Sequence, residues 1–340
     1  MWFIGDILLN GLIVSQPEKN IKRFRQIKSF FKDKSFVFAN LETPIFQDGH
    51  QNPSKGQLHT TSKEAIKLLR DINVFGVSLA NNHIFDCTEK GLKSTIDWLS
   101  ENKIKYTGAG ISKKDLDPIL FYNEDAEKVA FFAYVDMGTN PHFKESNKCF
   151  INKLNLNLIK KDIKKYRNDC DRIIISLHWG IDYIQYVSKQ QVDIAKEIVD
   201  FGADMIIGHH SHVIQPKLVH RNKPIFFGLG GMIFGDFMTK KGLESSFQKT
   251  KKGLIINVKQ NNLDYFKSSD NKGNVIKIEP FKNYLSQNKK LWEANKFFNR
   301  NEKLFRLYTR IELIRIKVFH FFFAYQNNPF NRLLKKMKHD

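Results

Sequence analysis

The chain has 340 residues, and its 55 Lys and Arg against 35 Asp and Glu give it a formal net charge of +20. Hydrophobic residues make up 41% of the sequence and aromatic residues 13%, enough to bury a substantial core. This composition excludes an intrinsically disordered chain, a collagen-like repeat and a small disulfide-stapled domain. The three cysteines form no Cys-x-x-Cys pair and are too few for a disulfide framework, which favours a reducing compartment.

We expect no export signal in the amino-terminal residues. Residues 1–4 run directly into Gly5 and Asp6, without a basic region, an apolar core or a small-residue cleavage site. The most apolar stretch, near 318–325, is short and contains His320, so a bilayer-spanning helix is not expected. We predict a cytoplasmic protein, with peripheral association at the membrane as a further option.

Short apolar runs alternate with amphipathic stretches along the first 260 residues. We expect strands at 2–4, 35–39, 74–80, 129–135, 172–177, 203–207, 224–228 and 254–258. Helices are expected at 17–31, 62–70, 89–102, 156–166 and 189–201. The second of these helices opens with Thr61 and Glu64, which form a capping-box pattern. Together these elements predict a layered α/β or α+β fold.

Unusual polar residues follow five of these strands, at the point where each strand ends. They are Asp6, Asn40, Glu42, Asn81, Asn82, His83, His178, His209, His210 and His212. In a layered sheet, groups at the carboxyl ends of neighbouring strands meet along one edge. Carboxylates, amide oxygens and imidazoles form a mixed ligand set suited to Mn²⁺, iron or Zn²⁺, and the absence of thiols argues against a structural zinc site. The sequence therefore predicts a metal site at this edge.

Each motif taken alone has an ordinary structural explanation. Residues 5–6 and 81–83 could form turns, because Gly and Asn tolerate left-handed conformations, and a single histidine after a strand is usually solvated. The run His209, His210 and His212 is stronger, because three imidazoles within four residues have few structural uses. The common placement of all the motifs favours metal binding.

Read in order, the motifs are Gly5-Asp6, Asn40-Leu41-Glu42, Leu79-Ala80-Asn81-Asn82-His83 with Asp86, His178-Trp179-Gly180, and Gly208-His209-His210-Ser211-His212 with Gln215-Pro216. This combination, over roughly residues 1–260, resembles the CapA family of capsule or poly-γ-glutamate biosynthesis proteins. The resemblance implies a calcineurin-like metallophosphoesterase fold, a β-sandwich flanked by helices.

The resemblance also implies two divalent metal ions, Mn, Fe or Zn, which would activate a bridging water. Their ligands would be Asp6 and His212 for the first ion, Asn82, His178 and His210 for the second, and Glu42 as the bridge. His83 would protonate the leaving group or stabilise the transferring phosphoryl group. Residues that would contact these ligands or the substrate are Asn40, Asn81, Asp86, His209 and Gln215.

Two positions depart from the expected patterns, the first from that of ordinary metallophosphoesterases, whose histidine the CapA family also commonly lacks, and the second from that of the CapA family. Leu8 stands where ordinary metallophosphoesterases have the histidine of Asp-x-His, which removes one ligand of the first metal. Gly231 replaces the asparagine that ends the family's Ser-Leu-Gly-Asn segment, so any contact of that side chain is lost.

The carboxyl-terminal segment is strongly basic, because residues 289–340 contain 13 Lys and Arg against 4 Asp and Glu. On a helical wheel, one face collects Leu304, Leu307, Tyr308, Ile311, Ile314, Val318, Phe321, Phe322 and Tyr325. The opposite face carries Arg306, Arg310, Lys317 and His320. Such a helix could attach to an anionic membrane, helped by Arg332, Lys335, Lys336 and Lys338, or it could dock on the protein's own core or in a dimer interface.

We therefore divide the chain into a CapA-like domain at 1–260, a connecting segment at 261–288 and a basic amphipathic helical tail at 289–340. The favoured function is a dinuclear-metal-dependent phosphoester hydrolase that acts on an anionic phosphorylated substrate or polymer in capsule or cell-surface polymer biosynthesis. The alternative is a non-catalytic metal-binding scaffold of a polymer-synthesis complex. No specific nucleic acid partner is predicted, because no recognised binding motif accompanies the charge.

Overall fold

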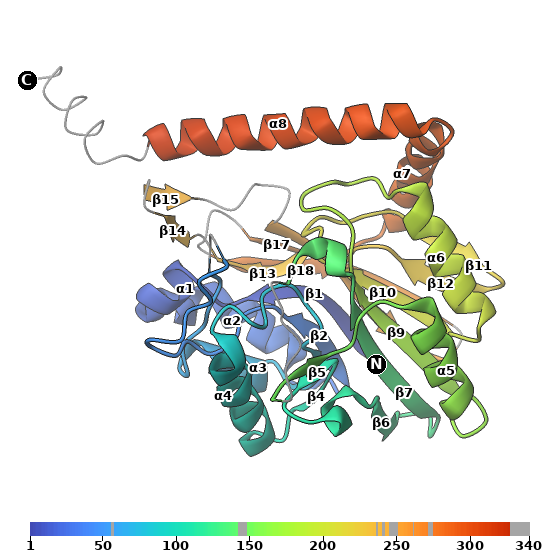
Figure 1. Cartoon of the computed structure of the whole chain (residues 1–340), viewed down its shortest axis with the longest axis horizontal. Helices are drawn as coiled ribbons and strands as arrows, with labels where there is room; N and C mark the ends of the chain where they lie inside the picture. Colours follow the sequence, from blue (N-terminus) through green and yellow to red (C-terminus); the bar gives the residue numbers. More distant parts are fainter. Residues whose placement is uncertain are drawn as a thin grey trace, which may run out of the picture.

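The structure, a computed structural model, describes residues 1–55, 58–141, 148–235, 237–239, 242–244, 251–260, 262–270 and 275–326. Two β-sheets pack against each other, and helices cover their outer faces (Figure 1). This arrangement confirms the predicted α/β sandwich flanked by helices.

The larger sheet has the strand order β18-β17-β16-β1-β2-β3-β4, and β13 also pairs with β1. Its strands are β1 (Trp2–Leu8), β2 (Val37–Leu41), β3 (Val74–Ser78), β4 (Lys105–Thr107), β13 (Gly231–Phe234), β16 (Lys252–Val258), β17 (Leu263–Asp270) and β18 (Ile276–Pro280). Strands β1 to β4 are parallel, whereas β16 to β18 are antiparallel.

The smaller sheet has the order β11-β12-β10-β9-β7-β6. Its strands are β6 (Ile119–Tyr122), β7 (Lys128–Val135), β9 (Arg172–His178), β10 (Met205–His209), β11 (Lys217–His220) and β12 (Lys223–Phe226). Two short pairs complete the strands, β5 (Ala109–Gly110) with β8 (Phe150–Ile151) and β14 (Phe237–Thr239) with β15 (Gly242–Glu244).

Alternating side chains divide the apolar interior into three layers. In β9, Ile173 and Ile175 pack under the helices of the smaller sheet, whereas Ile174 points between the two sheets. The inter-sheet layer is aromatic, with the ring of Phe38 4.6 Å from that of Phe131 and 5.2 Å from that of Phe121. Burial on both faces explains why these strands read as continuous apolar runs.

The helices lie on the two outer faces and at the carboxyl end of the chain. They are α1 (Leu12–Ser15), α2 (Asn20–Phe31), α3 (Leu68–Asp71), α4 (Thr88–Glu101), α5 (Leu156–Tyr166), α6 (Lys189–Asp200), α7 (Tyr284–Asn299) and α8 (Glu302–Gln326). Short 3₁₀ turns occupy Pro17–Lys19, Ala65–Lys67, Lys113–Leu116 and Met137–Thr139. Helices α2, α3 and α4 cover the larger sheet, and α5 and α6 cover the smaller one.

All eight predicted strands are present, but the second predicted helix is different. Residues 62–70 form a 3₁₀ turn followed by the short helix α3. The predicted capping box does not form, because Thr61 is extended and forms a β-bridge with Ile45. The hydroxyl of Ser62 accepts a hydrogen bond from the amide of Ala65 instead.

The sequence analysis assigned 261–288 to a connecting segment. Its described residues contain β17 and β18, which extend the larger sheet, and the beginning of α7. No helix in the part of the chain that the structure describes is long and apolar enough to cross a bilayer.

Candidate metal centre

The polar motifs meet where the carboxyl ends of strands from both sheets come together. In the larger sheet Asp6 pairs in register with Asn40, and in the smaller sheet His178 pairs in register with His209. Nδ1 of His209 lies 3.0 Å from Oδ1 of Asp6, so the two sheets touch through these side chains. The edge predicted from parallel strand ends is therefore formed jointly by two sheets.

Glycines allow this close approach. A β-carbon on Gly5 would lie 1.9 Å from the carbonyl oxygen of Gly230, and one on Gly208 would lie 1.8 Å from that of Phe227. The amide of Asp6 donates to the same Gly230 oxygen at 2.9 Å. No larger residue fits at these two positions, because the opposing backbone cannot move aside without breaking the sheet edge.

Asp6, Glu42 and His212 form the first of two compact groups. Nδ1 of His212 lies 2.9 Å from Oδ2 of Asp6, and its Nε2 lies 3.7 Å from Oε1 of Glu42. All three side chains are buried. Nδ1 of His209 bonds the other oxygen of Asp6, and His209 belongs to neither group.

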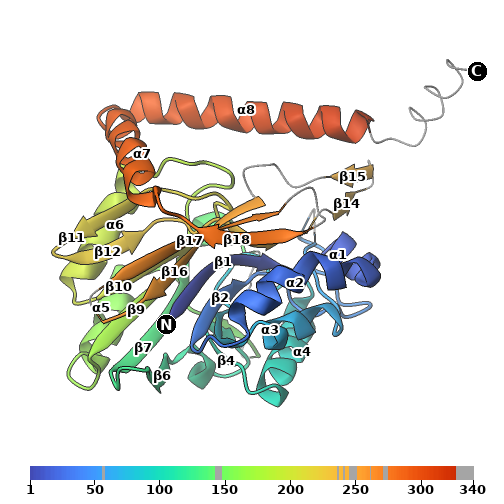
Figure 2. The ribbon, with the colours of Figure 1, turned by 180° about the vertical axis from the view of Figure 1, so that it is seen from behind.

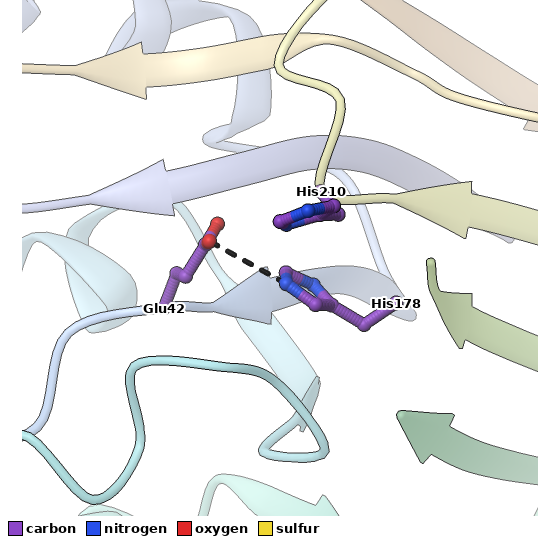
Figure 3. A group of neighbouring side chains, drawn as sticks. All are labelled: Glu42, His178 and His210. Atoms are coloured by element: carbon purple, nitrogen blue, oxygen red, sulfur yellow. Dashed lines mark ion pairs between the residues drawn. The ribbon is translucent and has the colours of Figure 1, made fainter. Parts of the chain in front are cut away.

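Glu42, His178 and His210 form the second group (Figure 3). Nε2 of His178 lies 3.6 Å from Oε1 of Glu42 and 2.9 Å from Oδ1 of Asn82. The rings of His178 and His210 have centroids 4.8 Å apart. Glu42 is thus shared by both groups, and Asn82 adds an amide oxygen beside the second.

Two atoms in these groups fit a metal ion better than any protein partner. Oε1 of Glu42 and Nδ1 of His210 are buried and have no hydrogen-bond partner among the described residues. A buried polar atom without a partner costs about 1–3 kcal/mol, so such atoms call for an explanation. A divalent cation would satisfy both, and carboxylate, imidazole and amide oxygen are its usual ligands.

The charge balance of the site also favours a cation. Burial raises the pKa of Glu42 well above its usual value despite the attraction of His212, and the nearby carboxylate of Asp6 adds to this effect. Burial opposes the ionisation of Asp6 too, but hydrogen bonds from His209 and His212 outweigh it and hold the pKa of Asp6 well below its usual range. Burial lowers the pKa of His212, yet Glu42 and Asp6 raise it to about 9. A bound cation would replace these protons.

Burial favours the neutral form of the two imidazoles of the second group. Burial and the neighbouring His210 lower the pKa of His178, and burial also lowers the pKa of His210. A neutral imidazole keeps the lone pair that a metal ion requires.

The backbone of the histidine motif is held in an uncommon conformation. His210 and His212 have φ angles of 87° and 55°, in the left-handed region that non-glycine residues rarely adopt. Each such residue costs about 1 kcal/mol or more. The surrounding strands maintain this conformation, and it turns both rings toward Glu42.

His83 lies beside the two groups in a contact network of its own. Its Nδ1 lies 2.8 Å from Oδ2 of Asp86, and its ring meets that of His59 edge to face at 4.4 Å. Burial and Lys55 lower the pKa of His83 well below its usual value, and burial raises that of Asp86 to about 6. Because Asp86 occupies Nδ1, Nε2 is the nitrogen available for proton transfer.

Two asparagines hold the carboxylates in place. The amide of Asn40 donates to Asp6 at 2.9 Å and to Glu42 at 3.4 Å. The amide of Asn81 donates to Oδ1 of Asn40 at 3.3 Å and to the carbonyl of Leu41 at 2.8 Å. Both asparagines therefore lie next to the candidate ligands, where the sequence motifs put them.

Gln215 does not reach the cluster. Its amide donates to the carbonyl of Ile184 at 2.8 Å, within the 181–187 loop. That loop carries Asp182, whose Oδ1 lies 3.6 Å from Nδ1 of His210 and 3.7 Å from Nε2 of His212. Asp182 was missed by the sequence reasoning, although a carboxylate only four residues after the candidate ligand His178 could have been considered as a further ligand.

Lys55 and His59 were also missed, because both lie outside the motifs that the sequence analysis identified at strand ends. Nζ of Lys55 donates to the carbonyl of Asn82 at 2.6 Å and lies 3.4 Å from Oδ1 of Asp86. The amide of His59 donates to Oδ2 of Asp86 at 2.6 Å. This loop therefore buttresses the His83 and Asp86 pair.

Paired clusters of buried carboxylates and imidazoles on a two-sheet sandwich define a candidate metal-binding protein of the α/β class. Comparison with known proteins identifies the family, because the profile of the bacterial capsule synthesis protein family PGA_cap matches residues 1–271. The chain belongs to this family.

Two curated relatives of this chain are capsule or PGA biosynthesis proteins. The capsule biosynthesis protein CapA of Bacillus anthracis is 30% identical over 250 residues, covering 71% of this chain and 61% of the relative. The PGA biosynthesis protein CapA of Bacillus subtilis is 26% identical over 242 residues, covering 70% of this chain and 64% of that protein. This chain thus matches about three fifths of the length of these relatives.

Among solved structures, the calcineurin-like phosphoesterase YfkN from Bacillus subtilis aligns with 14% identity and a TM-score of 0.44. The alignment covers 88% of this chain and 99% of that one.

Proposed function

We propose that this chain is a dinuclear-metal-dependent phosphoester hydrolase that acts on an anionic phosphorylated substrate or polymer. The observation that carries the proposal is the position of Glu42, which is shared by two buried ligand groups and has an oxygen without a protein partner. A carboxylate that two cations share is typical of sites for phosphoryl transfer.

The proposed ligands are divided between two cations. Asp6, Glu42 and His212 would hold one, and Glu42, His178 and His210 would hold the other with the amide oxygen of Asn82. Two such cations would supply an activated water and charge stabilisation for the phosphoryl group. Leu8 leaves the first set without the histidine of the Asp-x-His pattern. Asp182 would take the place of that ligand, because its Oδ1 lies 3.7 Å from Nε2 of His212.

The chain's own residues would then orient the substrate and move protons. His83 would exchange a proton with the leaving oxygen through Nε2, while Asp86 holds the ring and stabilises its charged form. The ammonium group of Lys55 would stabilise negative charge close to Asp86 and His83. Asn40 and Asn81 would keep the carboxylates in fixed positions.

The process that the enzyme serves is proposed from the names of its relatives. Both CapA relatives are described by capsule or PGA biosynthesis. We propose that the substrate is a phosphorylated precursor or linkage of a cell-surface polymer.

The test is metal content per chain, measured by elemental mass spectrometry on untagged protein after reconstitution with Mn²⁺, Fe²⁺ or Zn²⁺. Wild type is expected to hold about two ions, with a lower content in Asp6→Ala and in His210→Ala. His220→Ala is the matched control, because His220 bonds Asp200 at 2.9 Å on the surface of the smaller sheet. Two bound ions per chain, together with hydrolysis of at least one substrate in a phosphoester screen, would support the hydrolase function.

Two results would count against it. Metal-free wild type after reconstitution would contradict the dinuclear site, and metal retained in both variants would contradict its ligands. Two bound ions without turnover of any phosphomonoester or phosphodiester would favour the alternative function, a metal-binding scaffold.

A further inference from the structure

Helix α8 lies along one outer edge of the molecule. Both views show it running along the edge from α7 to β15, with the rest of the described chain on one side of it only (Figures 1 and 2). The helix also lies beyond residue 271, where the match to the capsule synthesis family ends. No residue of α8 belongs to either ligand group of the site described above.

One side of α8 is docked on the protein. Phe305 and Ile316 are only 9% and 5% exposed, and eleven residues, about three turns, separate them on one face. The ring of Tyr308 lies 4.7 Å from that of Phe298 in α7 and 5.0 Å from that of Tyr186 in the 181–187 loop. This docked side fixes which residues face outward.

The opposite side exposes a row of large apolar residues. Leu307, Ile311, Ile314 and Val318 are 53%, 54%, 53% and 47% exposed, and their spacing of four, three and four residues places them on one stripe. The stripe is about 16 Å long at the rise of an α-helix. Part of the predicted apolar face is thus free of the core, and a contiguous exposed apolar row is uncommon on a protein without a partner for it.

Cations flank this row. Exposed basic residues of α8 are Lys303, Arg306, Arg310, Arg315 and Lys317. The two acidic residues of α8, Glu302 and Glu312, form ion pairs with Arg306 at 2.6 Å and Arg315 at 3.4 Å. On a helical wheel Arg310 and Arg315 lie on opposite borders of the apolar row. The outer side is therefore apolar at its centre and basic at its edges.

We propose that this outer side, Leu307, Ile311, Ile314 and Val318 with the five flanking cations, docks on an anionic lipid bilayer. The apolar row would enter the boundary between headgroups and acyl chains while the cations bind lipid phosphates. A second copy of the chain would bring like charges together around the row. A nucleic acid would satisfy the cations but leave the apolar row in water. An anionic bilayer complements both features.

The test is co-sedimentation of the full-length protein with vesicles of phosphatidylcholine and phosphatidylglycerol. Leu307→Gln combined with Ile311→Gln is expected to weaken partitioning about 100-fold, at about tenfold for each apolar side chain withdrawn. The matched control replaces two exposed apolar residues elsewhere, Ile21→Gln with Leu285→Gln, which are 79% and 60% exposed. The control is expected to bind like wild type.

A second pair tests the charges. Arg310→Gln with Lys317→Gln is expected to weaken partitioning about 30-fold, at about 1 kcal/mol for each cation near the surface. Lys22→Gln with Arg25→Gln removes the same charge from exposed positions of α2 and is expected to have little effect. Circular dichroism on every variant establishes that α8 keeps its helical content.

Four outcomes would overturn the proposal. The first is a wild-type protein that does not sediment with the mixed vesicles, and the second is equal binding of wild type to vesicles of pure phosphatidylcholine. The third is unchanged vesicle binding by the Leu307→Gln and Ile311→Gln double variant. The fourth is a wild-type protein that is a dimer and a double variant that is a monomer, with neither of them binding vesicles. The last outcome would assign the row to a second copy of this chain.

Discussion

The candidate metal centre and the outer side of α8 both reverse the usual distribution of side chains, in opposite directions. At the centre, polar and ionisable groups such as Asp6, Glu42 and His178 are buried, whereas on α8 the apolar Leu307 and Ile311 are exposed. Soluble proteins bury apolar groups and expose charged ones, so each reversal has a free-energy cost unless a ligand relieves it. The comparison teaches that each region has a ligand that would relieve its cost: under the two proposals above, a cation at the first and a lipid bilayer at the second.

The two regions also differ in how firmly they are held. The centre is fixed by glycine contacts, asparagine hydrogen bonds and two sheets, whereas α8 is docked along one side only. We therefore expect substitutions at the centre to change stability or turnover strongly and substitutions on the outer side of α8 to change neither.

The largest effect is expected from His83→Ala. The variant should keep its metal content, because His83 belongs to neither ligand group, while kcat falls about 100- to 10,000-fold through loss of proton transfer. Steady-state kinetics with nitrophenyl phosphoesters, beside elemental analysis, would measure both quantities. Unchanged turnover would remove the acid role of His83.

Gly5→Ala is expected to destabilise the fold by more than about 2 kcal/mol, because the new β-carbon would collide with the Gly230 carbonyl. Denaturant unfolding would measure the loss. Gly138→Ala is the control, since its nearest contact would be the flexible side chain of Asp136 at 3.2 Å. Similar stability of the two variants would mean that β1 and β13 can separate without cost.

Asp204→Asn is expected to cost about 1–3 kcal/mol at neutral pH. Burial opposes the ionisation of Asp204, but hydrogen bonds from Lys223, Arg167 and the amide of Ile173 outweigh it and lower the pKa below its usual 3.8. A lowered pKa stabilises the fold above about pH 4 and loses that effect as the pH falls through the folded-state value. Unfolding curves for both proteins should therefore converge in acid; a gap that stays constant would contradict the charge-based explanation.

The smallest effect is expected within α8. Leu307→Ser should change the free energy of unfolding by less than about 0.5 kcal/mol, because the side chain faces solvent. Ile316→Ser on the docked side should cost about 2 kcal/mol or more. Thermal unfolding of the two variants would compare the sides directly, and equal losses would mean that the docked and exposed sides are assigned wrongly.

The sequence by itself determined the strands and the positions of the candidate ligands relative to them. Burial on both faces of a strand leaves a continuous apolar run, and a polar residue that ends the run marks the sheet edge. This is why Asp6, Glu42, His178 and the histidine motif could be grouped before any contact was known. These signals are local, because each depends on only a few consecutive residues.

Only the tertiary structure decided which long-range contacts complete the site and which side of α8 is covered. Asp182, Lys55 and His59 come from loops whose paths depend on how two sheets and the tail pack, and no periodicity reports that. The helical wheel likewise identified an apolar face on α8, but docking through Phe305 and Ile316 left Leu307 and Ile311 outside. Sequence periodicity records which residues avoid water, whereas tertiary packing selects the surface against which each of them is buried.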